Sequence, residues 1–206
     1  MRALLVLAAL VVARGALALR AGRLVANRLD AKLLAPRANT APAVVLIDFE
    51  NVRGIGTGFA LGHDSLLAAA KCWVRAKQLE GRVLLAVDHG AAHEAHWLGD
   101  AGLGLVFAGP QQTADDVLVR DAHYFTRTHR ADVVLVSADA QLRSRARARA
   151  AGACKVHLVH PSSLVSELEA AAAEVAEGTE AALSEADRAA LVSGLRALRE
   201  PHNSRR

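Results

Sequence analysis

The segment that most constrains the fold runs from residue 44 to residue 52. It begins with four aliphatic residues, Val44 to Ile47, and continues into an acid, Asp48, followed by Glu50 and Asn51. A short, uninterrupted aliphatic run is typical of a strand buried on both faces, as in parallel sheets. In open α/β sheets, ligands bind beyond the carboxyl ends of the strands. Asp48 is therefore the first candidate for a functional residue.

Downstream of this segment, strand-like and helical patterns alternate. Apolar runs predict strands at residues 43–48, 82–87, 103–107, 132–137 and 155–159, and helices are expected near 63–79, 91–99, 113–128 and 139–152. This alternation predicts an α/β, Rossmann-like three-layer fold with a central parallel sheet of about five strands. A hydrophobic content of 52% is enough to build its core.

The first 39 residues have the features of a targeting leader. An apolar run of about eleven residues follows Met1 and Arg2, and six Lys or Arg residues come after it with one acid. The signal-like start before a transit-like stretch favours import into a plastid. Mitochondrial import, secretion through a signal peptide and an ordinary N-terminal helix are the alternatives. The apolar run is short for a bilayer, so no membrane span is expected in the mature protein.

The rest of the chain divides into a globular body and a helical tail. The body is expected at residues 40–160, and the tail, at 161–206, carries Ala- and Glu-rich segments near 162–177 and 184–199. These helices are expected to pack on the body or on a partner, which is a second copy of the chain or another protein.

The charge distribution limits how the body can bind nucleic acid. Seven of the 25 Lys and Arg residues and one of the 21 Asp and Glu residues lie in 1–39, which leaves 18 basic and 20 acidic residues beyond it. Aromatic residues make up only 3% of the chain, which argues against a base-stacking platform. Any contact with nucleic acid must therefore come from a local basic patch.

Further acids come just after other predicted strands. Asp88 follows the second strand, Asp115 and Asp116 open the helix after the third, and Asp139 follows the fourth. A parallel sheet would bring them to one edge with Asp48. Clustered carboxylates need a cation, and oxygen ligands suit Mg²⁺ or Mn²⁺. Each acid also has a simpler interpretation, as a helix cap or a turn residue.

These motifs together resemble a known family. The motifs are Leu46-Ile47-Asp48-x-x-Asn51, Leu84-Leu85-Ala86-Val87-Asp88-His89, Thr113-Ala114-Asp115-Asp116 and Val136-Ser137-Ala138-Asp139. In this order and spacing they resemble the NYN branch of the PIN-like, FEN-like nucleases, including its YacP-like members. The resemblance covers roughly residues 43–160 and implies a metal-dependent endoribonuclease with a PIN-like sheet.

The resemblance also implies roles for individual residues. Asp48, Asp116 and Asp139 would be the metal ligands, Asp115 a neighbouring catalytic acid and Asn51 an orienting amide. Asp88 and His89 would be accessory residues. Some relatives carry one more acid shortly after the position of Asp139, whereas residues 140–144 contain none here. The sequence therefore favours one tightly held ion.

Candidate contacts to RNA come from the helix that follows Asp139. Arg143 and Arg147 share one face of this helix, while Arg145 and Arg149 share the opposite face, so only one pair can easily face substrate phosphates. The RNA-binding candidates are Arg143, Arg147, Arg120, Ser137 and Thr113. A solvated helix surface is the alternative interpretation of the arginines.

Other functions fit the sequence less well. The loop Gly54-x-Gly56 lacks the third glycine of a dinucleotide site. A haloacid-dehalogenase-type phosphatase needs Asp-x-Asp, but position 50 is Glu. On a helix, His89 and His93 would share a face and His96 would lie near it, but no further Cys or Asp completes a zinc set. The main alternative is a non-catalytic NYN-type module that binds RNA or a protein.

Overall fold

The computed structural model describes residues 34–35, 40–55, 62–150, 154–176 and 189. The strands are β1 (Ala41–Asp48), β2 (Val83–Val87), β3 (Glu94–Leu98), β4 (Leu103–Phe107), β5 (Ala131–Val136) and β6 (Val156–Val159). The helices are α3 (Phe49–Gly54), α4 (His63–Ala76), α5 (Ala114–Arg127), α6 (Ala140–Arg149) and α7 (Pro161–Ala176).

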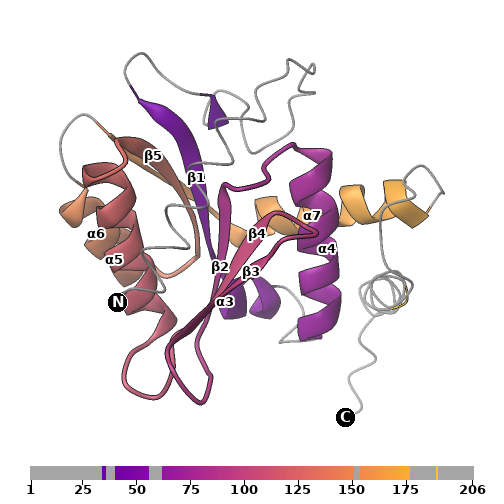
Figure 1. The fold of residues 1–206 in the computed structure, drawn as a ribbon, viewed down its shortest axis with the longest axis horizontal. Coiled ribbons are helices and arrows are strands. Elements are labelled where there is room, and N and C mark those ends of the chain that lie inside the picture. The colour runs from indigo at the N-terminus through magenta and orange to yellow at the C-terminus, as the bar shows by residue number, and fades with distance from the viewer. Residues whose placement is uncertain (1–33, 36–39, 56–61, 151–153, 177–188, 190–206) are drawn as a thin grey trace, which may run out of the picture.

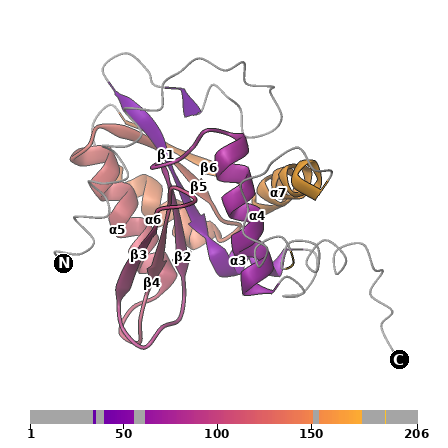
Figure 2. The ribbon, with the colours of Figure 1, turned by 45° about the vertical axis from the view of Figure 1, so that its right-hand side comes forward.

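The strands form one mixed sheet in the order β3-β4-β2-β1-β5-β6. All neighbouring strands run parallel except β3, which pairs antiparallel with β4. Helices α3, α4 and α7 cover one face, and α5 and α6 cover the other (Figures 1 and 2). The predicted α/β three-layer class is therefore confirmed, with six strands where about five were expected.

Strand β1 lies at the centre of the sheet. It pairs with β2 on one side and β5 on the other, and its residues from Ala43 to Ile47 are at most 2% exposed. Val45 faces the core beneath α4, where Trp73 is fully buried, whereas Leu46 faces the core beneath α5, where Phe125 is fully buried. The aliphatic run thus supplies side chains to both cores, as predicted. Its carboxyl end opens directly into α3.

The helix expected at residues 91–99 does not form; this segment contains β3. Along β3, Glu94 and His96 are exposed, while Ala95 and Trp97 pack against the core beneath α5. This alternation has the period of two typical of an edge strand with one covered face. A turn at 99–102 then reverses the chain into β4. The histidines considered for zinc consequently have no shared helix face.

Most of the proposed leader lies outside the described residues, but Leu34 does not. Leu34 is 5% exposed and belongs to the core beneath α4, and its carbonyl oxygen accepts a 2.6 Å hydrogen bond from Arg82 Nη2. Helix α7 corresponds to the first predicted tail helix, while the helix expected at 184–199 falls outside the described residues except for residue 189. None of the described helices is both long and apolar enough to cross a membrane.

Candidate active site

Asp48 is the most buried acid at the carboxyl edge of the sheet. It is 6% exposed at the junction of β1 and α3, where its Oδ1 accepts a 3.1 Å hydrogen bond from the backbone N–H of Asn51. Burial raises the pKa of Asp48 from 3.8 to about 6, against the lowering effect of hydrogen bonds from Asn51 and Ser137. The nearby charges of Asp115 and Asp88 raise this pKa further. Asp48 therefore stands in a negative, poorly hydrated environment.

Ser137 and Asn51 tie β1 to the loop after β5. The Ser137 hydroxyl donates to Asp48 Oδ2 at 3.0 Å and accepts from the backbone N–H of Asp139 at 3.1 Å. Asn51 Oδ1 accepts from the backbone N–H of Ala138 at 2.8 Å. Ser137 is fully buried, so its placement favours a role in orienting Asp48 over direct contact with RNA. The Asn51 backbone, not its amide, binds Asp48.

Asp139 and Asp88 both bind the N-terminus of a helix. Asp139 is the N-cap of α6, where its Oδ1 accepts from the backbone N–H of Leu142 at 2.7 Å. Asp88 follows β2, and its Oδ1 accepts from the backbone N–H of Ala114, the first residue of α5, at 2.8 Å. The capping interpretation is thus correct for Asp139, whereas Asp88, considered as a turn residue, binds the start of α5 from a distant segment. Each of these contacts uses one carboxylate oxygen. The other oxygen, Oδ2, accepts none of the hydrogen bonds found among the described residues.

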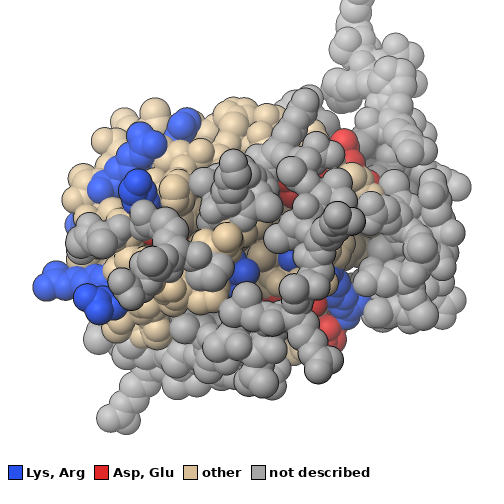
Figure 3. All heavy atoms as spheres, turned by 90° about the horizontal axis from the view of Figure 1, so that it is seen from above, with Lys and Arg blue, Asp and Glu red and all other residues tan. Residues whose placement is uncertain are grey.

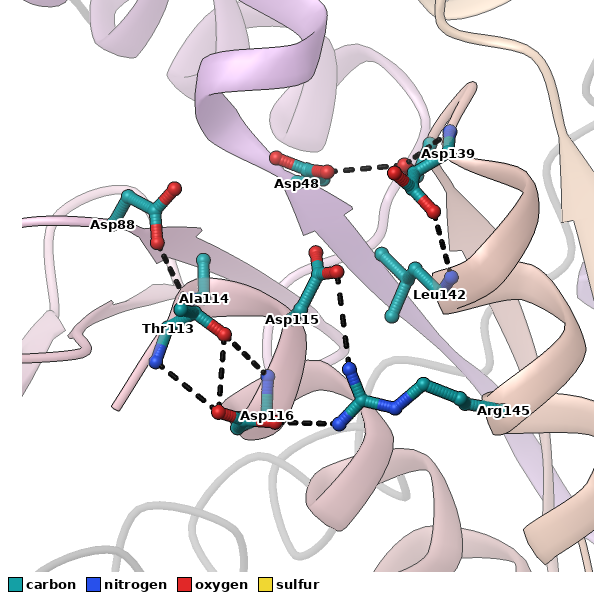
Figure 4. Close-up of polar contacts among 10 residues, drawn as sticks. Asp48, Asp88, Thr113, Ala114, Asp115, Asp116, Asp139, Leu142 and Arg145 are labelled. Atoms are coloured by element: carbon teal, nitrogen blue, oxygen red, sulfur yellow. Dashed lines mark hydrogen bonds and ion pairs between the residues drawn. The ribbon is translucent and has the colours of Figure 1, made fainter. Parts of the chain in front are cut away.

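The two adjacent acids of α5 have different surroundings. Asp116 completes a capping box with Thr113 and binds the guanidinium of Arg145. Arg145 lowers the pKa of Asp116, whereas burial, and then the charge of Asp139, raise the pKa of Asp115. In Figure 4 the Asp115 carboxylate points toward Asp48, and Asp116 points away from it. The structure thus favours Asp115, where the sequence pointed to Asp116, as the α5 acid of the site.

Four carboxylates therefore border one region at this edge of the sheet (Figure 4). They come from four separate segments: Asp48, Asp88, Asp115 and Asp139. They also act on one another electrostatically, since Asp115 and Asp88 raise the pKa of Asp48 and Asp139 raises that of Asp115. The N-termini of α3, α5 and α6 meet here, and their partial positive charge offsets part of this repulsion.

The donor set fits a hard divalent cation by its chemistry. All donors are carboxylate oxygens, and those of Asp115 and the free oxygens of Asp88 and Asp139 are available. In the arrangement seen, no three Asp, Glu, His or Cys side chains among the described residues stand close enough to enclose an ion. The carboxylates would therefore have to draw together around one.

The arginines of α6 lie differently from the sequence prediction. Leu142 and Ala146 form the buried side of this helix, and Arg145 flanks it next to α5, where it reaches Asp115 and Asp116. Arg143 is partly buried and Arg147 is exposed. Neither is seen to contact the four carboxylates.

Other residues considered for the site lie at its margin or elsewhere. Arg120 donates to Asp121 at 3.0 Å, Thr113 caps α5, and His89 is exposed after β2. Figure 3 views the opposite end of the sheet, where Lys and Arg gather mainly on one side, the side on which α5 and α6 lie in Figure 1. Much of the basic surface in that view is therefore remote from the acids.

Comparison with solved structures gave a structural likeness. No family model matches the chain, and no curated protein matches it. The chain is similar to the crystal structure of a mutant of Rae1 (YacP) from Bacillus subtilis, with a TM-score of 0.46 and 12% sequence identity. The match covers 73% of this chain and 98% of the other. At this sequence identity, the likeness concerns the structure alone.

Proposed function

We propose that this chain is an endoribonuclease that hydrolyses RNA phosphodiester bonds with a carboxylate-bound Mg²⁺ or Mn²⁺ ion. The observation that carries the proposal is the meeting of Asp48, Asp88, Asp115 and Asp139 at the carboxyl edge of the sheet. Carboxylates gathered without a cation repel one another and lose hydration. A bound divalent cation would relieve this repulsion, which favours its binding. RNA as the substrate follows from the resemblance of the motifs to the NYN nucleases.

The residues that would hold the ion are Asp48 and Asp139, with Asp88 as a third oxygen donor. Asp116 is less suited than the sequence indicated, because Thr113 and Arg145 already bind its carboxylate. When bound, such an ion lowers the pKa of a water molecule and stabilises negative charge on the leaving oxygen.

The protein itself would orient the site and accept a proton. Ser137 and the backbone of Asn51 fix both oxygens of Asp48, so this carboxylate is held in one orientation. Asp115 accepts no hydrogen bond from the described residues, and its raised pKa favours uptake of a proton from the attacking water. Asp115 is therefore our candidate for the general base.

The proposal is tested by incubating the purified chain with 5′-labelled single-stranded RNA in Mg²⁺, Mn²⁺ or EDTA. We expect cleavage only with a divalent ion. The variants Asp48→Asn, Asp115→Asn and Asp139→Asn should each lose at least about 100-fold in rate. The matched control is Asp100→Asn, because Asp100 is exposed and lies in the turn between β3 and β4, at the other end of the sheet. Equal rates in all four variants would refute the site.

A second candidate function is a module that binds RNA without cleaving it. Two observations favour it: residues 140–144 contain no further acid, and Asp116 is engaged by its neighbours. Retention of the labelled RNA with no cleavage in either metal ion would select this function over the nuclease.

A further inference from the structure

Arg145 is the cation that the described residues place against the acidic edge. It projects from α6 toward the first turn of α5, where its Nη2 donates to Asp116 Oδ1 and its Nη1 lies 4.0 Å from Asp115 Oδ2 (Figure 4). One guanidinium thus contacts both an acid that borders the site and an acid that points away from it. Arg145 therefore lies at the boundary of the site.

The ion pair contributes little to folding. The side chains of Arg145 and Asp116 are 44% and 46% exposed, so water and salt screen their attraction. Exposed pairs of this kind are worth roughly 0–1 kcal/mol. Leu142 and Ala146 already fasten α6 to the core. A purely structural explanation of Arg145 is consequently weak. Its Nη1, which lies 4.0 Å from Asp115, can turn to another anion at small cost while Nη2 stays on Asp116.

An RNA phosphate that approaches this edge meets five negative side chains, those of Asp48, Asp88, Asp115, Asp116 and Asp139. One divalent ion offsets only part of that charge. Arg145 can add a positive charge beside Asp115, and its planar fork can donate two hydrogen bonds to phosphate oxygens. The exposure of its side chain leaves it reachable from solvent.

We propose that Arg145 binds a substrate phosphate next to the carboxylates and that Asp116 is the positioning residue that holds it there. This inference rests on the proposed function, since it assigns the phosphate to an RNA bound at the same edge. It gives Asp116 a role other than metal binding. It also gives the site a positive group besides the ion.

The first test measures binding without catalysis. Fluorescently labelled single-stranded oligouridylate is titrated in EDTA at several salt concentrations with the wild type, Arg145→Ala, Arg145→Lys and Arg127→Ala. The control residue Arg127 is exposed at the far end of α5, roughly 18 Å along the helix axis from Asp115. Circular dichroism checks that each variant is folded.

We expect Arg145→Ala to weaken binding about 3- to 10-fold and to reduce the slope of log K against log salt by about 0.7. Arg145→Lys should keep the slope but recover only part of the affinity, because a lysine loses the fork. Arg127→Ala should match the wild type. Equal affinity and slope in Arg145→Ala and the wild type would overturn the inference.

The role of Asp116 is tested by a double-mutant cycle on the rate of RNA cleavage in Mn²⁺. If Asp116 acts through Arg145, Asp116→Asn lowers the rate in the wild type but has no further effect in Arg145→Ala. Additive losses would contradict positioning and would return Asp116 to the metal ligands.

The outcomes separate this inference from the proposed function. If the wild type cleaves RNA and Arg145→Ala binds RNA as well as the wild type does, the proposed role of Arg145 is wrong and the proposed nuclease function stands. If RNA binding depends on Arg145 but no RNA is cleaved, the phosphate contact is supported and the nuclease function is refuted. An absence of both RNA binding and cleavage in the wild type refutes both.

Discussion

The hydroxyl of Ser137 donates a 3.0 Å hydrogen bond to Asp48 Oδ2, although 89 positions separate the two residues in the sequence. This bond crosses from the end of β1 to the end of β5, its neighbour in the sheet. The same hydroxyl accepts from the backbone N–H of Asp139, so one buried oxygen sets the positions of two of the four carboxylates. The geometry of the site thus depends on the pairing of β1 with β5.

Ser137→Ala should therefore loosen the site and destabilise the fold. It leaves Asp48 Oδ2 without this donor and the Asp139 N–H without its acceptor, at a cost of about 1–3 kcal/mol in the free energy of unfolding. Because the Ser137 bond lowers the pKa of Asp48, its loss should move that pKa above 6. Urea unfolding from pH 4 to pH 8 measures both effects. Ser144→Ala on the exposed side of α6 is the control, and a similar change in both variants would refute the role of Ser137.

The stability of the metal-free protein should depend on pH through Asp48. The pKa of Asp48 is about 6 in the folded protein and about 3.8 in the unfolded chain. Between pH 3.8 and pH 6 the folded state therefore binds more protons than the unfolded state. The favourable contribution of the protonated carboxyl is therefore present below about pH 4 and lost as the pH rises through 6.

Asp48→Asn isolates this contribution, because an asparagine does not ionise. From pH 4 to pH 7 in EDTA, the wild type should lose about 2.4 kcal/mol of stability relative to the variant. Urea unfolding of both proteins at each pH gives the difference. Parallel profiles would show that Asp48 is not desolvated in the folded protein.

Divalent ions should stabilise the wild type through the same carboxylates. At a tenfold excess over the dissociation constant, Mn²⁺ or Mg²⁺ should raise the melting temperature at pH 7 by roughly 3–6 °C. Asp48→Asn and Asp139→Asn should show little of this rise, whereas Asp100→Asn should keep it. Calorimetry with and without EDTA makes the comparison. An equal rise in every variant would place ion binding elsewhere.

The sequence was sufficient for the features set by local patterns. The aliphatic run of β1 is stable only at the centre of a sheet covered on both faces. The position of Asp48 at the carboxyl edge of the sheet follows, because it ends this run. The capping role of Asp139 was also foreseen as an alternative, because a cap depends on residues close in sequence. The helix predicted at residues 91–99 was wrong. The alternation in β3 covers only five residues, and its neighbours have no strong preference for helix or strand.

The sequence could not decide which acid of α5 faces the site. Adjacent helix residues point about 100° apart, so the choice between Asp115 and Asp116 depends on how Ala114 and Val117 pack. Arg145 was missed for a related reason. A signal for it did exist, because Leu142 and Ala146 are spaced as a buried stripe and Arg145 lies on one flank of it.

The last prediction concerns the boundary of the folded body, which the sequence placed at residue 39. Leu34 is buried in the core, and Arg82 donates to its carbonyl oxygen at 2.6 Å and to that of Ala43 at 2.9 Å. Burial lowers the pKa of Arg82 to about 10, so the loss of either carbonyl leaves a costly, under-bonded cation. A chain shortened to begin at residue 40 should therefore be less stable than one that begins at residue 30.

We expect the difference in unfolding free energy to be about 2–4 kcal/mol, which combines a lost core leucine with a lost hydrogen bond. Leu34→Ala in the longer chain separates these terms, since it removes the side chain and keeps the carbonyl. Exposed Ala35→Gly is the control. If both shortened chains unfold at the same urea concentration, Leu34 is dispensable and a leader ending at residue 39 stands. If they differ as expected, Leu34 belongs to the folded body.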